Sequence, residues 1–255
     1  ILRTRLVITT MSKRKNPTSI LYYQRMGFLP EALVNYLGRM GWSMPDEREK
    51  FSLPEMEAAF DIKRVSLGGP IFDVEKLRWL NGLWIRESLD VEALAERLQT
   101  WALNKAMLMK VLPHAQARME VLSDFVPMSA YLASGDLSLN AAQFEALSEP
   151  LDETLRRLQF VLWRLESHQD WQRDGLFAAL KQLADQLALK PKPLFAPLFI
   201  AIAGSNAAYS LPDSMAILGP DMTRSRLRNA IDVLGGVSKK ATKRLEKEYT
   251  SLPSA

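Results

Sequence analysis

The sequence predicts an all-α protein, and three observations support this prediction. Apolar residues recur at spacings of three and four along most of the 255 residues, which is the period of a helix face that packs on a core. Capping residues and glycines repeatedly bracket these stretches, as they do at helix ends. Only residues 1–10 are rich in β-branched side chains without helical spacing, and no convincing partner strand follows.

The composition is that of a globular protein and excludes several kinds of functional site. A chain with 47% hydrophobic and 24% charged residues is typical of globular proteins and has room for one large domain or two to three small ones. The absence of cysteine excludes disulfides, thiolate zinc sites and a cysteine nucleophile. The only two histidines, His114 and His168, argue against a histidine-based metal site or triad. Since no apolar run is long enough to span a bilayer and no signal-peptide pattern is present, we expect a cytoplasmic protein with no membrane partner.

The first 101 residues are predicted to form a short strand, a basic loop and a series of helices. The strand, residues 1–10, leads into the loop 11–15, whose cations and serine could fold over a polyphosphate. A solvated loop is the alternative for this stretch. Ser52 and Glu55 have the spacing of a capping box, and Asp73 and Asp90 are suited to cap later helices. The expected helices cover 20–26, 30–40, a segment from 53, a segment from 74 to about 85, and 91–101.

The second half of the chain is also predicted to be helical. A helix starts at Pro113, with Ala117, Val121 and Leu122 facing inward and Arg118 pointing away. Phe125–Val126–Pro127 breaks this pattern, and 189–194, with Pro191 and Pro193, is an extended link. Gly204 and Gly219 end helices, and Thr223 caps the one that follows Gly219. The other expected helices are 140–147, 152–166, 170–187, 195–202, 212–218, 224–234 and 238–249.

Charge is distributed unevenly along the chain. The 33 basic and 29 acidic residues give a net charge of +4, which permits a polyanionic partner without requiring one. Residues 134–155 are acidic, whereas 221–247 contain eight cations. This polarity indicates a protein that lies along a nucleic acid on one side. The cations are Arg224, Arg226, Arg228, Lys239, Lys240, Lys243, Arg244 and Lys247.

Motifs of small-molecule chemistry are absent from the sequence. No glycine-rich phosphate loop, paired-carboxylate pattern or metal-ligand spacing is present, and Gly68–Gly69 lacks the context of a nucleotide motif. The residues by themselves therefore predict a helical, mildly basic module able to bind nucleic acid.

Three long strings in fixed order carry a family resemblance. SKRKNPTSI, GFLPEALVNYLGRMGWSMPD and RVSLGGPIFDVEKLRWLNGLWIRE closely resemble the carboxyl half of bacterial glutamyl-tRNA synthetases, which are class I enzymes. The similarity runs from Met11 to about Glu87, and it recovers at 118–122 and 197–231. It implies four parts: 1–15, the end of a catalytic domain; 16–89, a helical stem-contact domain; 90–128 and 129–255, two helical anticodon-binding subdomains.

The resemblance also implies site residues. Met11, Ser12, Lys13 and Arg14 match the mobile loop that binds ATP, although Thr10 stands where the family normally has lysine.

Six further residues match positions that contact tRNA. Lys76 and Arg78 fall where the family faces the inner corner of tRNA, and Arg118 matches an arginine that reads the third anticodon base. An exposed helix cation with no such role is the alternative for Arg118. Ala208, Tyr209 and Leu211 lie where other anticodon bases pack, with Tyr209 as a stacking face, while Phe199 replaces a common arginine.

The function implied by the resemblance belongs to a complete parent enzyme. That enzyme activates glutamate with ATP and magnesium and transfers it to tRNA-Glu. Because the first class I signature is not found here, the chain alone is expected to be inactive, to contain no catalytic or metal-binding residue and to need no cofactor. It is expected to bind tRNA-Glu as a monomer. The alternative is a non-enzymatic helical module that binds RNA or a protein partner.

Overall fold

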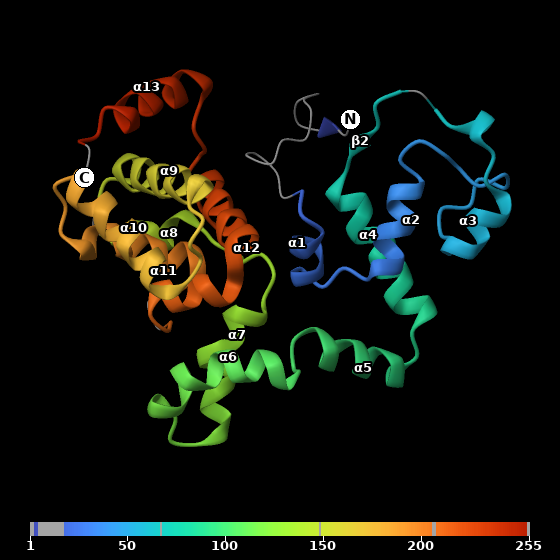
Figure 1. Ribbon diagram of the computed structural model, residues 1–255, viewed down its shortest axis with the longest axis horizontal. Coiled ribbons are helices and arrows are strands. Elements are labelled where there is room, and N and C mark those ends of the chain that lie inside the picture. Colours follow the sequence, from blue (N-terminus) through green and yellow to red (C-terminus); the bar gives the residue numbers. More distant parts are fainter. Residues whose placement is uncertain (1–2, 5–17, 67, 148, 206–207, 254–255) are drawn as a thin grey trace. The chain divides into compact units, whose positions relative to one another are not determined.

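The computed structural model confirms the all-α prediction (Figure 1). It divides the chain into two compact units, unit 1 (Ile1–Asn104) and unit 2 (Lys105–Ala255). No helix in the described part of the chain is long and apolar enough to cross a membrane. The finer four-part division stays a prediction. The structure describes residues 3–4, 18–66, 68–147, 149–205 and 208–253.

Unit 1 is a group of short helices with one small pair of strands. The strand Ile71–Phe72 (β2) pairs in parallel with Arg3–Thr4 (β1), so the sequence analysis missed a partner strand. Its two residues are too few to show a strand pattern in the sequence. The remaining elements are α1 (Ile20–Arg25), α2 (Pro30–Gly38), α3 (Leu53–Ala59), the 3-10 turn η1 (Ile62–Arg64), α4 (Val74–Ser88) and α5 (Val91–Trp101).

Three predicted caps in unit 1 are confirmed. Ser52 and Glu55 form a reciprocal capping box at α3, the Asp73 side chain accepts from the first turn of α4, and Asp90 accepts from Ala93 N in α5. Each cap satisfies backbone N–H groups that the helix cannot pair itself. These helix starts are therefore fixed by local sequence.

A buried asparagine joins the elements of unit 1. The Asn35 side chain on α2 accepts from Trp84 Nε1 at 3.0 Å and from Phe51 N at 3.3 Å. It also donates to the Glu49 carbonyl at 3.1 Å. Because a buried amide without partners would cost free energy, this satisfied side chain fixes α4 and the loop before α3 against α2. Trp42, Met44 and Phe51 form a small apolar cluster beside it.

Unit 2 packs its helices around α12. Helices α9, α10 and α11 all contact α12, and their apolar faces form the core; Figure 1 shows them grouped beside it. The elements are α6 (Lys105–Ala115), η2 (Gln116–Arg118), η3 (Leu122–Asp124), α7 (Phe125–Ala133), α8 (Ala141–Glu145), α9 (Leu151–Ser167), α10 (Arg173–Gln186), α11 (Pro191–Ala203), α12 (Leu211–Val233) and α13 (Lys239–Thr250).

The prediction that a helix starts at Pro113 is wrong. Pro113 lies near the end of α6, and two 3-10 turns follow. The Asp124 side chain accepts from the backbone N–H groups of Glu120 and Val121 at 2.9 and 3.0 Å, which holds this stretch in a turn instead of a helix. Leu122, expected inside, is consequently 87% exposed.

Two proline-rich stretches were also misassigned. Helix α11 already begins at Pro191, and 125–127 form the first turn of α7. Proline is compatible with the first turn because its missing N–H has no intrahelical partner there. The predicted break at 125–127 is therefore helical, and so are residues 191–194 of the predicted extended link, whereas 189–190 lie outside the helix.

The predicted interruption at Gly219 is confirmed, but its form differs from the expectation. Gly219 has φ 78° and ψ 173° inside α12, which bends there, and the helix resumes at Pro220. Thr223 is fully buried within the second half of α12, so it does not cap a new helix.

Candidate functional site

The segment that enters α12 in unit 2 is fixed by local and long-range hydrogen bonds. Ser210 is the N-cap of α12, and its hydroxyl accepts from Asp213 N at 3.4 Å. The backbone N–H of Tyr209 donates to the Tyr131 hydroxyl at 3.3 Å, and that hydroxyl is 2.6 Å from Ser214 Oγ. This segment is therefore held against α7 as well as α12.

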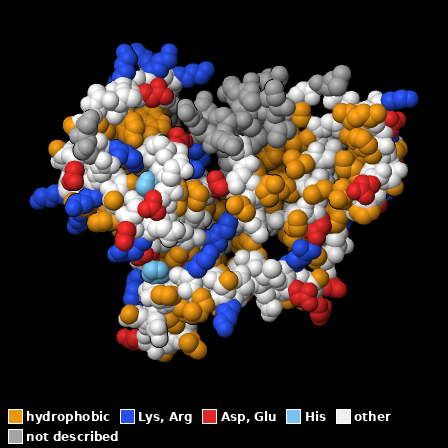
Figure 2. Space-filling view, in the orientation of Figure 1, with side chains coloured by type: hydrophobic (Ala, Val, Ile, Leu, Met, Phe, Trp, Pro, Cys, Tyr) orange, Lys and Arg blue, Asp and Glu red, His pale blue; other side chains and the backbone are white. Residues whose placement is uncertain are grey.

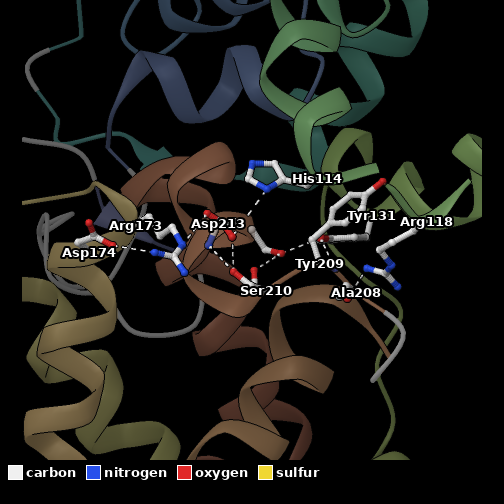
Figure 3. A network of polar contacts seen from close by, with 10 residues as sticks. His114, Arg118, Tyr131, Arg173, Asp174, Ala208, Tyr209, Ser210 and Asp213 are labelled. Carbon is white, nitrogen blue, oxygen red and sulfur yellow. Dashed lines mark hydrogen bonds and ion pairs between the residues drawn. The ribbon is translucent and has the colours of Figure 1, made fainter. Parts of the chain in front are cut away.

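Arg118 lies directly on this segment. Its Nη1 donates to the Ala208 carbonyl at 3.1 Å, and its guanidinium carbon is 5.4 Å from the centre of the Tyr209 ring. Figure 3 shows Arg118 beside Ala208 and Tyr209, although the two segments are 90 residues apart in sequence. Arg118 is exposed and forms no other hydrogen bond within the described part of the chain, so further N–H groups of its guanidinium are available to a ligand. The structure thus brings together three residues that the resemblance assigned separately.

Tyr209 does not offer the open stacking face that was expected. It is only 2% exposed, and its hydroxyl is 2.7 Å from Ser129 Oγ. Leu211 is also buried. Both side chains therefore pack in the interior of unit 2, and Arg118 is the exposed side chain of the site.

A charged group adjoins the same helix start. Asp213 Oδ2 is 3.7 Å from His114 Nδ1 and Asp213 Oδ1 is 3.5 Å from Arg173 Nε; Figure 3 shows Asp213 between these two side chains. The His114 ring also lies 6.1 Å from that of Tyr209. Asp213 therefore links α6 and α10 to the start of α12.

Arg226, on the second half of α12, supports the site from within the core. It is fully buried, and it donates to the carbonyls of Tyr131, Ser134, Gly135 and Ile202. These carbonyls lie at the ends of α7 and α11. Arg226 thereby fastens α12 to the ends of two helices next to the Arg118 site.

The expected basic surface 221–247 is only partly present. Arg226 is internal, Arg224 Nη2 donates to the Leu165 carbonyl at 2.7 Å, and Arg228 pairs with Glu166 at 2.9 Å. These three arginines hold unit 2 together and do not form a surface. The five cations of α13 are exposed.

In unit 1, Lys76 belongs to a cluster of charges. Lys76 Nζ is 2.8 Å from Glu49 Oε1, and Arg39 pairs with the same carboxylate. The hydrogen bond from Lys76, with a further contribution from Arg39, lowers the pKa of Glu49 below its usual value. A cavity of about 310 Å³ adjoins the cluster, and its lining includes Arg39, Tyr36, Asp73 and Lys76.

Arg78 is not brought together with Lys76. Both are exposed on α4, but residues two apart on a helix point in different directions. The two cations therefore flank opposite sides of the buried residue Leu77. Met11, Ser12, Lys13 and Arg14, the predicted ATP loop, lie outside the described residues, as does Thr10.

Several supporting residues were missed by the sequence analysis. Ser129, Tyr131 and Ser214 carry no motif. Arg226 did leave a signal, because it shares a helix face with the buried residues Met222 and Ala230 at spacings of four. A cation on an apolar face predicts burial. In the described residues no group of acidic or histidine side chains could hold a metal, so no step through magnesium is assigned to them.

Two family models match the chain. Residues 93–231 match the anticodon binding domain, and residues 1–79 match the catalytic domain of class I tRNA synthetases (E and Q). The first match covers more than half of the 255 residues and includes Arg118 and the segment before α12. The chain belongs to this family of anticodon-binding proteins.

Curated relatives confirm the resemblance to bacterial glutamyl-tRNA synthetases. A glutamate–tRNA ligase of Cellvibrio japonicus is 60% identical over 95% of this chain and 48% of its own length. That of Saccharophagus degradans is 57% identical over 96% of this chain and 48% of its own length. The chain thus spans about half the length of these relatives. A crystal structure of a glutamate tRNA ligase from Elizabethkingia meningosepticum is 23% identical, with a TM-score of 0.48, over 92% of this chain and 50% of that one.

Proposed function

We propose that this anticodon-binding chain docks tRNA-Glu for a glutamate–tRNA ligase and checks its anticodon with Arg118. The observation that carries the proposal is the contact of Arg118 with Ala208 and Tyr209. A guanidinium held from one side by a carbonyl and a ring keeps its other donors in fixed directions. A planar, oriented donor group is suited to hydrogen-bond and stack on an unstacked RNA base.

The other contacts of the complete ligase are part of the same proposal. Lys76 and Arg78 contact the inner corner of the tRNA. Ala208, Tyr209 and Leu211 shape the surface on which the anticodon loop rests, with the two buried side chains acting indirectly. The ATP-binding loop contains Met11, Ser12, Lys13 and Arg14. The whole enzyme uses this ATP, together with magnesium, to activate glutamate. The protein acts in the cytoplasm, and the chain is monomeric.

Binding of the 255-residue chain to two transcripts tests the proposal. One transcript is tRNA-Glu, and the other differs only in the third anticodon base, which is changed to the glutamine type. We expect the chain to prefer tRNA-Glu by about tenfold, which corresponds to about 1.4 kcal/mol. Arg118→Gln removes the guanidinium and is expected to abolish this preference.

The matched control is Lys181→Gln, which removes one exposed positive charge from α10 of the same unit. It should retain the preference. Equal affinity of the unmodified chain for both transcripts, with binding that depends only on salt, would favour the non-enzymatic RNA-binding alternative. No RNA binding at low salt would favour a protein-interaction module.

A further inference from the structure

Helix α13 carries five exposed cations on one face. They are spaced so that, at 100° per residue, all five fall within an arc of about 140°. The inward-facing residue Leu245 is 4% exposed and lies on the opposite side of the helix. The five cations are Lys239, Lys240, Lys243, Arg244 and Lys247, and we call them the α13 basic face.

The α13 basic face retains a net positive charge, since it holds five cations and a single exposed carboxylate, Glu246, lies at its edge. None of its five cations forms an ion pair within the described part of the chain. Of the two carboxylates on α13, Glu248 points inward to pair with Arg156, and Glu246 is exposed. The adjacent Glu153 is itself paired with Arg156 at 3.1 Å. Figure 2 shows the resulting concentration of Lys and Arg side chains over α13.

The orientation of this face is fixed by specific contacts with α9. Arg156 Nε is 2.8 Å from Glu248 Oε1, and Arg164 Nε donates to the Tyr249 hydroxyl at 3.2 Å. The Tyr249 ring packs 5.4 Å from Phe160 and 5.5 Å from Trp163, measured between ring centres. Because α13 is anchored through this inner side, its cations are held together on the surface in spite of their mutual repulsion.

The α13 basic face is separate from the Arg118 site. Within unit 2, α13 lies over α9, on the side away from α6 and α7 (Figure 1). Residues 239–250 also lie beyond the segment 93–231 that matches the anticodon-binding family. The α13 basic face is therefore a second surface of unit 2, distinct from the Arg118 site.

We propose that the α13 basic face binds the phosphodiester backbone of the tRNA, outside the anticodon loop. Charge complementarity selects this occupant, because adjacent unpaired cations favour a polyanion that releases counterions on binding. Lys239, Lys243 and Lys247 form a row about 12 Å long, which can follow several phosphates. Flexible lysines contribute point charges without reading bases, so the contact strengthens binding without selecting sequence. The proposal rests on the proposed function, since it takes tRNA as the partner.

A triple variant of the full chain, Lys239→Gln, Lys243→Gln and Lys247→Gln, tests this inference. Binding to tRNA-Glu and to an unrelated tRNA is measured at several salt concentrations. Removal of three phosphate contacts should reduce the slope of log affinity against log salt by about 2. At 0.1 M salt the affinity for both RNAs should fall about tenfold, while the preference for tRNA-Glu stays unchanged.

Two matched variants complete the experiment. Lys181→Gln, Lys190→Gln and Lys192→Gln together remove the same charge from exposed positions on and between α10 and α11, and they should change the salt slope less. Lys239→Arg, Lys243→Arg and Lys247→Arg keep the charge and should retain binding. An unchanged slope in the first variant, or an equal loss in the α10–α11 variant, would overturn the proposal.

The result can be separated from failure of the proposed function. If Arg118→Gln leaves base preference unchanged but the α13 variant still weakens tRNA binding, the anticodon role fails and the backbone contact stands. If Arg118→Gln behaves as expected and the α13 variant binds normally, only the backbone contact fails.

Discussion

Two arginines of unit 2 have opposite roles because their surroundings differ. Arg118 is exposed and, among the described residues, makes a single hydrogen bond, to the Ala208 carbonyl, so most of its donors remain available to a ligand. Arg226 is fully buried and donates to several main-chain carbonyls. A buried charge is tolerated only when its hydrogen-bonding groups are satisfied. Arg226 is therefore a structural residue, although the sequence analysis counted it among the cations of a basic surface.

Arg226→Met should strongly destabilise unit 2. The methionine fills part of the same volume, but the carbonyls of Tyr131, Ser134, Gly135 and Ile202 lose a buried donor. Since each unsatisfied buried group costs about 1–3 kcal/mol, we expect the free energy of unfolding to fall by at least about 3 kcal/mol. Urea denaturation followed by circular dichroism measures this loss.

Two comparisons make the Arg226 prediction specific. Arg226→Lys keeps the charge but cannot replace a planar group with five donors, so it should recover little stability. Arg224→Met removes a half-buried arginine that donates to Leu165, and it should cost less than Arg226→Met. Equal stability of Arg226→Met and the unmodified chain would show that the carbonyls find other partners.

At the scale of elements, the bend in α12 connects the site to the core. The half before Gly219 begins at the Ser210 cap, directly after the Ala208 and Tyr209 that Arg118 contacts. The half after Gly219 carries Arg226. Because of the bend, one helix both begins at the Arg118 site and places Arg226 in the core. It depends on a backbone conformation, with φ 78° and ψ 173°, that residues other than glycine rarely adopt.

Gly219→Ala should destabilise the protein through backbone strain alone. A Cβ added at Gly219 would meet no atom within 4 Å, so steric overlap with neighbours does not contribute. We expect a loss of about 1–3 kcal/mol, measured by urea denaturation, together with weaker preference for the third anticodon base. Gly41→Ala is the control, because its Cβ would make an ordinary contact of 3.7 Å and its φ lies outside the positive region. Equal effects of the two substitutions would contradict this explanation.

Helices were predictable from the sequence where a capping side chain fixes their first residue. Ser52, Asp73 and Asp90 cap their helices within three residues, so their helices were assigned correctly. The assignments failed at 125–127 and 191–193, where proline occupies the first turn of a helix. Proline breaks a helix in its interior but is compatible with its first turn, so its presence alone does not show which case applies. The assignments also failed at 116–124, where Asp124 forms a turn in a segment with helical spacing.

The candidate site was predictable only in part. The family resemblance predicted roles for Arg118, Ala208, Tyr209 and Leu211, but the proximity of Arg118 to Ala208 depends on a contact between segments 90 residues apart. The buried Tyr209 hydroxyl bonds to Ser129, a partner that has no sequence signal. Likewise, Arg224, Arg226 and Arg228 appear as a basic run in the sequence. The apolar face that Arg226 shares with its helix neighbours indicates its burial, whereas only tertiary contacts reveal that the half-buried Arg224 and Arg228 bind Leu165 and Glu166.

At the scale of the whole molecule, favourably placed carboxylates make stability depend on pH. The Lys76 hydrogen bond lowers the pKa of Glu49, and backbone N–H donors lower the pKa of Glu55 and of Asp124. A carboxyl with a depressed folded-state pKa stabilises the fold above its unfolded pKa, and this contribution is lost as pH falls. Partial desolvation raises the pKa of Asp232, which acts in the opposite direction and favours the folded state at lower pH.

Glu49 and Glu55 lie in unit 1 and Asp124 lies in unit 2, so acid should lower the stability of both units. We expect the free energy of unfolding to decrease as the pH falls from about 5 to about 3, around and below the ordinary carboxyl pKa. Glu49→Gln removes one contributor, so its stability should fall less steeply over this range. The difference should be below about 1 kcal/mol, since Glu49 is partly exposed and solvent screens its ion pairs.

Urea denaturation at a series of pH values measures this difference. The matched control is Glu57→Gln, which removes an exposed carboxylate of α3 that has no ion-pair partner among the described residues. Because Glu49 bridges Lys76 and Arg39, its removal also leaves these two cations facing each other at neutral pH. Glu49→Gln should therefore be less stable than Glu57→Gln at pH 7, and the two should converge near pH 3. A constant difference between them at all pH values would indicate that Glu49 acts through packing and not through its charge.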